Sequence, residues 1–312
     1  MQVFQTIEEA SALVSSGSVV TIGNYDGIHR AHQAIISDLA SRARAKGQKS
    51  ILVTFDPHPS LTIAPAKATK LLTTTGEKIR LLREGGLLDA VLVLHFDEAL
   101  AKVSATDFLV RYLLAGLRMS TLVVGYNHAF GHKREGDIKF MKAKAPEYGF
   151  EIVALEPVLF EAEVVNSSRI RGLMASGAFA EAITLLGHPF ELSGKVVHGK
   201  GLGLKMGFPT VNIKLPKEKI VPKPGVYAAY SLIGSDKRAG MMYIGEIAQP
   251  EFDLEFNVFD FEGDLYGQTV GVFPSAFIRP PLRFDSEREL IAQIGRDEEM
   301  IRSVYDIRLC KE

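Results

Sequence analysis

The chain has 312 residues, of which 46% are hydrophobic and 23% are charged, a composition typical of a globular protein of two domains. The formal net charge of −1 argues against nucleic acid as a partner. The single Cys310 excludes an internal disulfide framework, and no apolar run approaches the ~20 residues of a membrane span. Because the first residues also lack the pattern of a secretory signal, we expect a cytoplasmic protein without a membrane segment.

The first strongly patterned stretch, residues 18–32, predicts a buried strand, a glycine-bearing turn and the first turn of a helix. Gly23 and Gly27 allow the backbone to bend and to approach a ligand closely. His29 and His32 follow, three residues apart, so both rings would lie on one helix face beside free backbone N–H groups. This arrangement suits a polyphosphate, and metal binding or no function are the alternatives.

Strand-like and helix-like segments alternate as far as about residue 160. The predicted strands are 18–23, 50–55, 89–95, 120–125 and 151–155. One intervening helix is expected to end at Gly47, and Ser104 is expected to cap another. The alternation predicts a parallel sheet with helices on both faces, in which ligands bind beyond the carboxyl ends of the strands.

Six of the eight histidines follow carboxyl ends of the predicted strands, which indicates a shared site. They are His29, His32, His58, His95, His128 and His132. Farther along, Ser167 and Ser168 open a helix that can bind phosphate, where Arg169 or Arg171 could clamp the same group. Two serines before a helix are equally well explained as caps.

Beyond about residue 186 the pattern changes to short strands without helices between them, which predicts a small barrel. The segment 186–190 looks like a linker. The predicted strands are 191–198, 225–233, 239–245, 252–261 and 264–273. Ser286 and Glu289 form a capping-box pattern that starts a final helix, expected to pack against the barrel.

Taken in order, these motifs resemble the bifunctional prokaryotic riboflavin kinase/FAD synthetase family, whose first half is a nucleotidylyltransferase with a histidine-x-x-histidine motif. The matching stretches are 21–32, 54–59, 124–131, 134–137 and 167–171, then 199–212 with Gly207-Phe208-Pro209-Thr210-Val211-Asn212, 225–228, Glu255 and 264–267. The resemblance implies a Rossmann-like adenylyltransferase domain over 1–185 and a riboflavin-kinase-like antiparallel β-barrel with a terminal helix over 186–312.

The resemblance further implies two ATP-dependent steps, riboflavin to FMN in the barrel and then FMN to FAD, with release of pyrophosphate, in the first domain. Implied catalytic residues of the first domain are His29, His32, Asn127, Ser167, Ser168 and Arg171, and implied binding residues are Gly23, Asn24, Tyr25, Asp26, Gly27, His58 and Arg134. In the barrel, Glu255 would be the base, Thr210 and Asn212 would hold Mg²⁺, and ATP would contact Gly199, Gly201, Lys205, Gly207 and Pro209. The partners would be ATP, riboflavin, FMN and FAD, and the chain would act as a monomer or weak homo-oligomer.

Some positions depart from the family pattern. Ala31 replaces a glycine, His128 an aromatic residue and His188 an arginine. The loop before Gly207 usually reads glycine-arginine, but here it reads Gly203-Leu204-Lys205-Met206, and Glu246-Ile247-Ala248-Gln249-Pro250 belongs to a shortened connection before Glu255. Because the barrel departs more, the alternative is an FMN adenylyltransferase with a degenerate flavin-binding barrel. A metal-dependent hydrolase and a non-catalytic flavin carrier are the remaining alternatives.

Overall fold

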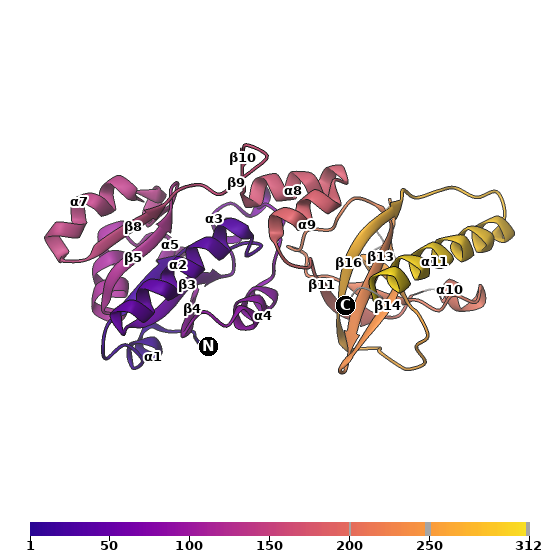
Figure 1. Cartoon of the computed structure of the whole chain (residues 1–312), viewed down its shortest axis with the longest axis horizontal. Helices are drawn as coiled ribbons and strands as arrows, with labels where there is room; N and C mark the ends of the chain where they lie inside the picture. Colours follow the sequence, from indigo (N-terminus) through magenta and orange to yellow (C-terminus); the bar gives the residue numbers. More distant parts are fainter. Residues whose placement is uncertain (200, 247–250, 310–312) are drawn as a thin grey trace. The chain divides into compact units, whose positions relative to one another are not determined.

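The computed structural model describes residues 1–199, 201–246 and 251–309. The chain divides into two compact units, Met1–Ser167 and Ser168–Glu312 (Figure 1). No helix within the described ranges is long and apolar enough to cross a membrane.

The first unit is built on a six-stranded parallel sheet of order β1-β4-β3-β2-β5-β8. The strands are β1 Gln2–Phe4, β2 Ser18–Ile22, β3 Lys49–Asp56, β4 Ala90–His95, β5 Met119–Gly125 and β8 Glu151–Leu155. The five predicted strands and their parallel arrangement are confirmed. The three-residue β1 was not predicted, because it is too short to show a period and forms only an edge beside β4.

Helices cover both faces of this sheet, as the alternation predicted (Figure 1). One face packs against α1 Ile7–Ser11, the π-helix Phe108–Gly116 and α7 Ile138–Tyr148, and the other against α2 Arg30–Lys46 and α4 Thr75–Gly85. Shorter elements complete the unit: α3 Pro59–Ile63, α5 Glu98–Ala101, α6 Ala105–Asp107, two 3-10 turns at Pro65–Lys67 and His132–Arg134, β6 Ala129–Phe130, β7 Gly136–Asp137, β9 Leu159–Phe160 and β10 Glu163–Val164.

Alternation along the strands explains the two cores. In β2, Val20 and Ile22 face the α1 side, whereas Val19 faces α2. Helix α2 ends where predicted, because Gly47 adopts the left-handed conformation at φ 61° and its N–H bonds back to the last turn. Buried β-branched strands therefore hold both helix layers against the sheet.

The second unit contains a closed antiparallel barrel of order β11-β12-β15-β14-β13-β16. Its strands are β11 Leu192–Val197, β12 Val211–Lys214, β13 Gly225–Ile233, β14 Asp236–Ile244, β15 Leu254–Val258 and β16 Thr269–Arg279, and α10 Leu202–Lys205 lies in the first long loop. The barrel is confirmed, but the strand predicted at 264–273 begins only at Thr269. Asp264 accepts a hydrogen bond from the Tyr266 backbone N–H, which makes the intervening residues a turn.

Two helices, α8 Ser167–Ser176 and α9 Phe179–Leu186, belong largely to the second unit. The Lys223 backbone N–H donates to the Met174 carbonyl, and the Phe179 ring meets Tyr227 edge to face. The compact units therefore meet at 167/168, earlier in the chain than the expected domain boundary after residue 185. As a boundary between functions, 185/186 stays a prediction.

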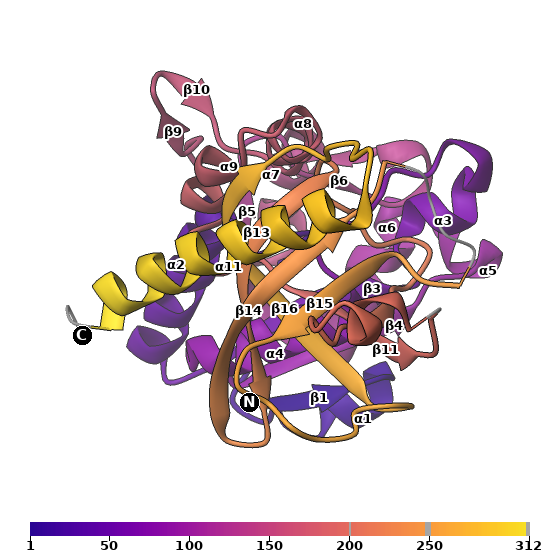
Figure 2. The same cartoon turned by 90° about the vertical axis from the view of Figure 1, so that its right-hand side faces the viewer.

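The terminal helix α11, Glu287–Leu309, packs on the outer face of the barrel beside β14 (Figure 2). Arg279, the last residue of β16, makes a bidentate ion pair with Asp297 of α11, with Nη2 2.6 Å from one carboxylate oxygen. Gln293 donates to the other oxygen at 2.9 Å. The side chain of Asp297 is only 3% exposed, so this pair fixes both ends of the connecting segment 280–286.

Candidate active sites

The loop between β2 and α2, residues 23–28, has an unusual backbone. Tyr25, Gly27 and Ile28 all have positive φ, at 49°, 91° and 39°. Glycine takes this conformation without strain, whereas tyrosine and isoleucine adopt it at a cost of roughly 1–3 kcal/mol each. Such a loop persists only where neighbouring groups hold it in place.

Side chains from distant segments provide these contacts. The Thr73 backbone N–H donates to Asp26 Oδ1 at 3.0 Å, and the Gly27 backbone N–H donates to Thr73 Oγ1 at 2.9 Å. Ser167 Oγ donates to the Asp26 carbonyl at 2.9 Å. The end of the loop is thereby held from two directions.

A buried lysine on α4 holds the beginning of the loop. Lys78 Nζ donates to the Asn24 carbonyl at 2.6 Å and to Thr54 Oγ1 at 3.1 Å, and the residue is 3% exposed. Burial lowers the pKa of Lys78 to about 8, although the carboxylates of Asp26 and Asp56 oppose this shift. Thr73 and Lys78 were not predicted from the sequence. The only sequence feature that could have pointed to Lys78 is its position directly after the Thr74–Glu77 capping box.

The two histidines of the first motif form a stacked pair. His29 is the N-cap residue of α2, and its ring lies 3.6 Å from that of His32, centroid to centroid, at 16°. Burial, together with the charges of His29 and Lys78, lowers the pKa of His32 well below its usual value. His32 is therefore neutral at pH 7, and its buried Nδ1 has no hydrogen-bond partner among the described residues. Imidazole rings at a helix N-terminus can donate hydrogen bonds to phosphate oxygens.

The sheet topology brings a second loop to the same edge. Strand β2 has β3 on one side and β5 on the other, which makes its carboxyl end a topological switch point. Asn127 and His128 lie in the loop after β5, the strand that pairs with β2. Burial and the charge of Arg134 lower the pKa of His128 to about 4, so this ring is also neutral at pH 7.

Other predicted residues have local roles or lie elsewhere. His58 Nδ1 accepts from the Ser60 backbone N–H at the start of α3, and His132 Nδ1 lies 3.1 Å from the Ala101 carbonyl oxygen. Ser168 and Arg171 belong to the second unit, and their expected contact with the phosphates stays a prediction. The part of the chain that the structure describes contains no cluster of three or more His, Cys, Asp or Glu able to hold a metal ion.

In the second unit, strand register brings three predicted residues together. Asn212 of β12 lies directly opposite Glu255 of β15. Thr210 Oγ1 is 3.4 Å from Glu255 Oε2. The backbone at Gly199 approaches so closely that a Cβ there would overlap the Asn212 side-chain amide. Any larger residue at position 199 would therefore force the Asn212 side chain to move.

Two hydrogen bonds to backbone carbonyls of the loop stabilise the segment from Gly201 to Pro209. The Phe208 N–H donates to the Gly203 carbonyl at 2.8 Å, and Asn257 Nδ2 donates to the Pro209 carbonyl at 2.6 Å. Gly201 and Gly207 have φ values of 66° and 84°, which only glycine adopts readily. The sequence analysis missed Asn257.

Lys205 and Leu204 are exposed on α10 in this loop. Residues 247–250 of the shortened connection before Glu255 lie outside the described residues.

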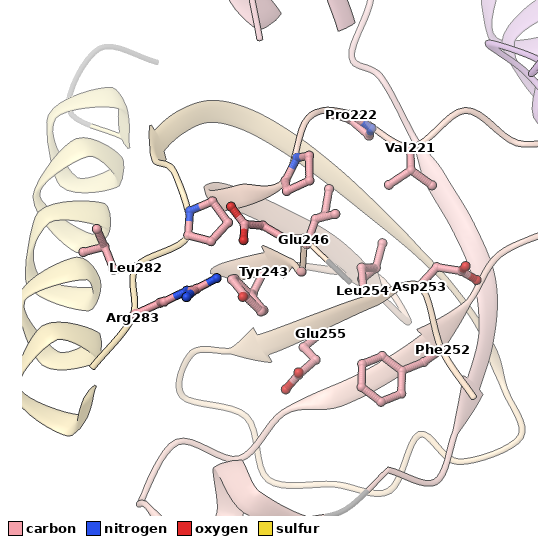
Figure 3. A pocket seen from close by; sticks show the side chains of 14 residues that line it. Val221, Pro222, Tyr243, Glu246, Phe252, Asp253, Leu254, Glu255, Leu282 and Arg283 are labelled. Atoms are coloured by element: carbon pink, nitrogen blue, oxygen red, sulfur yellow. The ribbon is translucent and has the colours of Figure 1, made fainter. Parts of the chain in front are cut away.

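Glu255 also lines a cavity of about 680 Å³ at one end of the barrel (Figure 3). Tyr243 lies beside it on the neighbouring strand, while Leu282 and Arg283 contribute from the segment before α11. Burial raises the pKa of Glu255, and its hydrogen bond with Thr210 opposes the rise. A carboxylate with a raised pKa at the wall of a cavity is well suited to accept a proton.

Comparison with known proteins agrees with this division into two sites. Residues 12–169 match the family model for FAD synthetase, and residues 186–305 match the model for riboflavin kinase. The chain is 37% identical over 311 residues to the bifunctional riboflavin kinase/FMN adenylyltransferase of Escherichia coli (strain K12), which covers 98% of this chain and 99% of that protein. It is 32% identical over 292 residues to the protein of the same name from Listeria monocytogenes, covering 92% of each.

One solved structure is similar over the whole length of the chain. It is that of a Streptococcus pneumoniae protein described as a macrolide-efflux protein, with a TM-score of 0.84 and 28% identity over 97% of this chain and 99% of that one. The order of the two folds along the chain is thus shared with that Streptococcus pneumoniae protein.

Proposed function

The chain belongs to the bifunctional riboflavin kinase/FMN adenylyltransferase family, whose two activities make FMN from riboflavin and FAD from FMN, and from this we propose which residues carry each step. Both family models match, so the barrel is a riboflavin kinase domain and not a remnant attached to an adenylyltransferase. The single observation that carries the assignment of residues is the stacked histidine pair at the N-terminus of α2.

In the first domain, a phosphate oxygen of FMN attacks the α-phosphorus of ATP in line, and pyrophosphate leaves. We propose that His29 and His32 donate hydrogen bonds to the ATP phosphates, where negative charge develops. The N-terminus of the 17-residue α2 adds the positive end of its dipole and free N–H groups. Positioning and electrostatic stabilisation account for catalysis of this kind, and no covalent nucleophile is needed.

Further residues are proposed for the remaining phosphate oxygens. Asn127 would reach the phosphates from the loop after β5, and Ser168 and Arg171 would contact the leaving pyrophosphate. Ser167 already donates its hydroxyl proton to the Asp26 carbonyl. We therefore assign to Ser167 the role of holding the β2–α2 loop. Binding roles for Gly23, Tyr25, His58 and Arg134 follow from the resemblance alone.

In the barrel, we propose that Glu255 accepts the proton of the riboflavin 5′-hydroxyl as that oxygen attacks the γ-phosphorus of ATP. The cavity of about 680 Å³ falls within the range of small-molecule sites and would take the flavin ring. The Gly199–Pro209 loop would cover the phosphates with its backbone N–H groups. Each of these residues lies on the loops and strands that meet near Glu255.

The donors beside Glu255 fit a magnesium ion. Thr210 and Asn212 offer a hydroxyl and an amide oxygen, and small hard cations of this kind prefer oxygen ligands together with substrate phosphates. When bound, the cation would neutralise phosphate charge. We infer Mg²⁺ as the cofactor from this donor set.

One assay tests both halves. The purified chain is incubated with Mg-ATP and either riboflavin or FMN, and the flavins are separated by chromatography. We expect Glu255→Gln to lower FMN formation by about 10²–10⁴-fold while FAD still forms from supplied FMN. The double variant His29→Ala/His32→Ala should show the opposite pattern. Normal FAD synthesis by the histidine variant would refute the proposed phosphate site.

We also propose where the chain acts and how it assembles. The single cysteine supports a cytoplasmic location, where thiols stay reduced. Both candidate sites are described within one chain, which supports action as a monomer or weak homo-oligomer. Sedimentation at micromolar concentration measures the second point, and a stable tetramer would contradict it.

A further inference from the structure

We propose that Lys78 is a positioning residue for FMN adenylylation, whose ammonium holds the Asn24 carbonyl and thereby the loop that presents the histidine pair to ATP. The inference rests on the proposed role of His29 and His32. It concerns a side chain on α4 that would not itself touch the substrate.

The first argument is the cost of burying this charge. An ammonium taken out of water costs several kcal/mol unless its bonds are replaced. Lys78 is 3% exposed. Its ammonium donates one hydrogen bond to the Asn24 carbonyl, after the end of β2, and one to Thr54 Oγ1 of β3. Neither bond joins Lys78 to its own helix. The ammonium therefore stabilises the β2–α2 loop and not α4.

The second argument is that α4 does not depend on this lysine for its own position. Its N-terminus is closed by a capping box, in which Thr74 Oγ1 accepts from the Glu77 N–H and Glu77 accepts from the Thr74 N–H. Leu82 anchors the helix in the core below the sheet. An apolar side chain at position 78 would satisfy the packing of the helix without a buried charge. What such a side chain would not supply is the bond to Asn24.

The third argument is the strain of the loop. Residues 25, 27 and 28 have positive φ; contacts from Thr73 and Ser167 hold Asp26 and Gly27, and Gln33 Nε2 donates to the Ile28 carbonyl at 2.8 Å. At the start of the loop, the Asn24 carbonyl receives one bond from Lys78 at 2.6 Å and a longer one from Thr54 at 3.3 Å. Removing the ammonium leaves the weaker of the two, so the loop can relax away from the geometry that places His29.

The charge of Lys78 has a measurable consequence. The groups that face it are the carboxylates of Asp26 and Asp56, which favour its protonated form, and the His32 ring, whose pKa its charge lowers. Glu77, on the same helix, is occupied by the capping box. With a pKa of about 8, the lysine loses its proton as the pH rises through that value, and with it the charge-assisted bond. FAD formation should therefore decline above about pH 8.

The experiment compares Lys78→Met and Lys78→Arg with Arg83→Met, a matched loss of charge at an exposed position of the same helix. Initial rates of FAD formation from FMN and of FMN formation from riboflavin are measured from pH 6.5 to 10. Because misplacing catalytic groups by about 1 Å can cost 10²-fold, we expect Lys78→Met to lower kcat for FAD formation by about 10–10²-fold. The riboflavin kinase rate of the same variant, and both rates of Arg83→Met, should match those of the unaltered chain.

Lys78→Arg decides the matter even if the methionine variant folds poorly. Its guanidinium stays charged throughout this range, so the alkaline decline in FAD formation should disappear or move up by more than one pH unit. A kcat of Lys78→Met equal to that of the unaltered chain, or an unchanged alkaline decline in Lys78→Arg, overturns the proposal. If the His29/His32 double variant also keeps its activity, the proposed phosphate site fails as well; if that variant is inactive, only the role of Lys78 is lost.

Discussion

Replacing Arg279 with methionine should destabilise the second unit by about 3–5 kcal/mol, the cost of leaving a buried charge without its partner. Asp297 is 3% exposed on its side chain and would keep only the bond from Gln293. Arg279 itself is 16% exposed, so solvent screens the pair little. Methionine preserves most of the packing volume, which confines the loss to the ionic interaction.

The double variant Arg279→Met/Asp297→Leu provides the control. With both charges absent, no ion remains buried, so most of the lost stability should return. Urea unfolding followed by far-ultraviolet circular dichroism measures this, because the chain contains no tryptophan to report by fluorescence. The transition of the first unit serves as an internal reference.

The single variant Arg279→Met should also weaken riboflavin binding. Pro281, Leu282 and Arg283, in the segment that the ion pair fixes at both ends, line the cavity beside Glu255 (Figure 3). Freeing that segment should raise the KM for riboflavin while FAD formation from supplied FMN stays unchanged. A loss of stability below 1 kcal/mol, or a double variant no more stable than the single one, would refute the reasoning.

Two further predictions concern the barrel. Burial raises the pKa of Glu255, and a base acts only when it is deprotonated. As the pH is lowered, riboflavin kinase activity should therefore begin to fall at a higher pH than it would with an exposed glutamate. Glu255→Gln should abolish this acidic limb of the pH–rate profile. Gly199→Ala should sharply reduce kinase activity because the new Cβ overlaps Asn212, whereas Gly295→Ala, in open space on α11, should raise the free energy of unfolding by roughly 0.5–1 kcal/mol. Equal effects of the two alanines in kinase assays and melting curves would contradict the argument.

The sequence predicted the fold best where the pattern of apolar residues extended over a whole strand or helix. The central parallel strands and the 225–233 strand were predicted nearly to the residue, because buried strands form continuous apolar runs between glycine and proline signals. The strand expected at 264–273 begins later, since Asp264 forms a turn that its own residue type permits but does not require. The short β1 has no period of its own and exists through its pairing with β4.

The candidate site residues likewise include some that the sequence predicted and some that it did not. The candidate residues on the motif loops could be named mainly through the resemblance to the family, because glycine and histidine at those spacings suit a phosphate-binding turn but leave other roles open. Lys78 could not, because a lysine in an amphipathic helix is usually an exposed residue and only the tertiary structure shows it buried. The pairing of Asn212 with Glu255 likewise depends on strand register, a property of two segments far apart in the chain.

The stacking of the His29 and His32 imidazoles also limits how many positive charges the proposed nucleotide site can carry. Two rings 3.6 Å apart cannot both carry a positive charge cheaply, so the pair carries at most one positive charge at a time. A polyphosphate bound beside the pair would favour its protonation, and the departure of pyrophosphate would reverse that effect. The heat of ATP binding should therefore vary with the ionisation enthalpy of the buffer, with a slope of at most one proton per nucleotide.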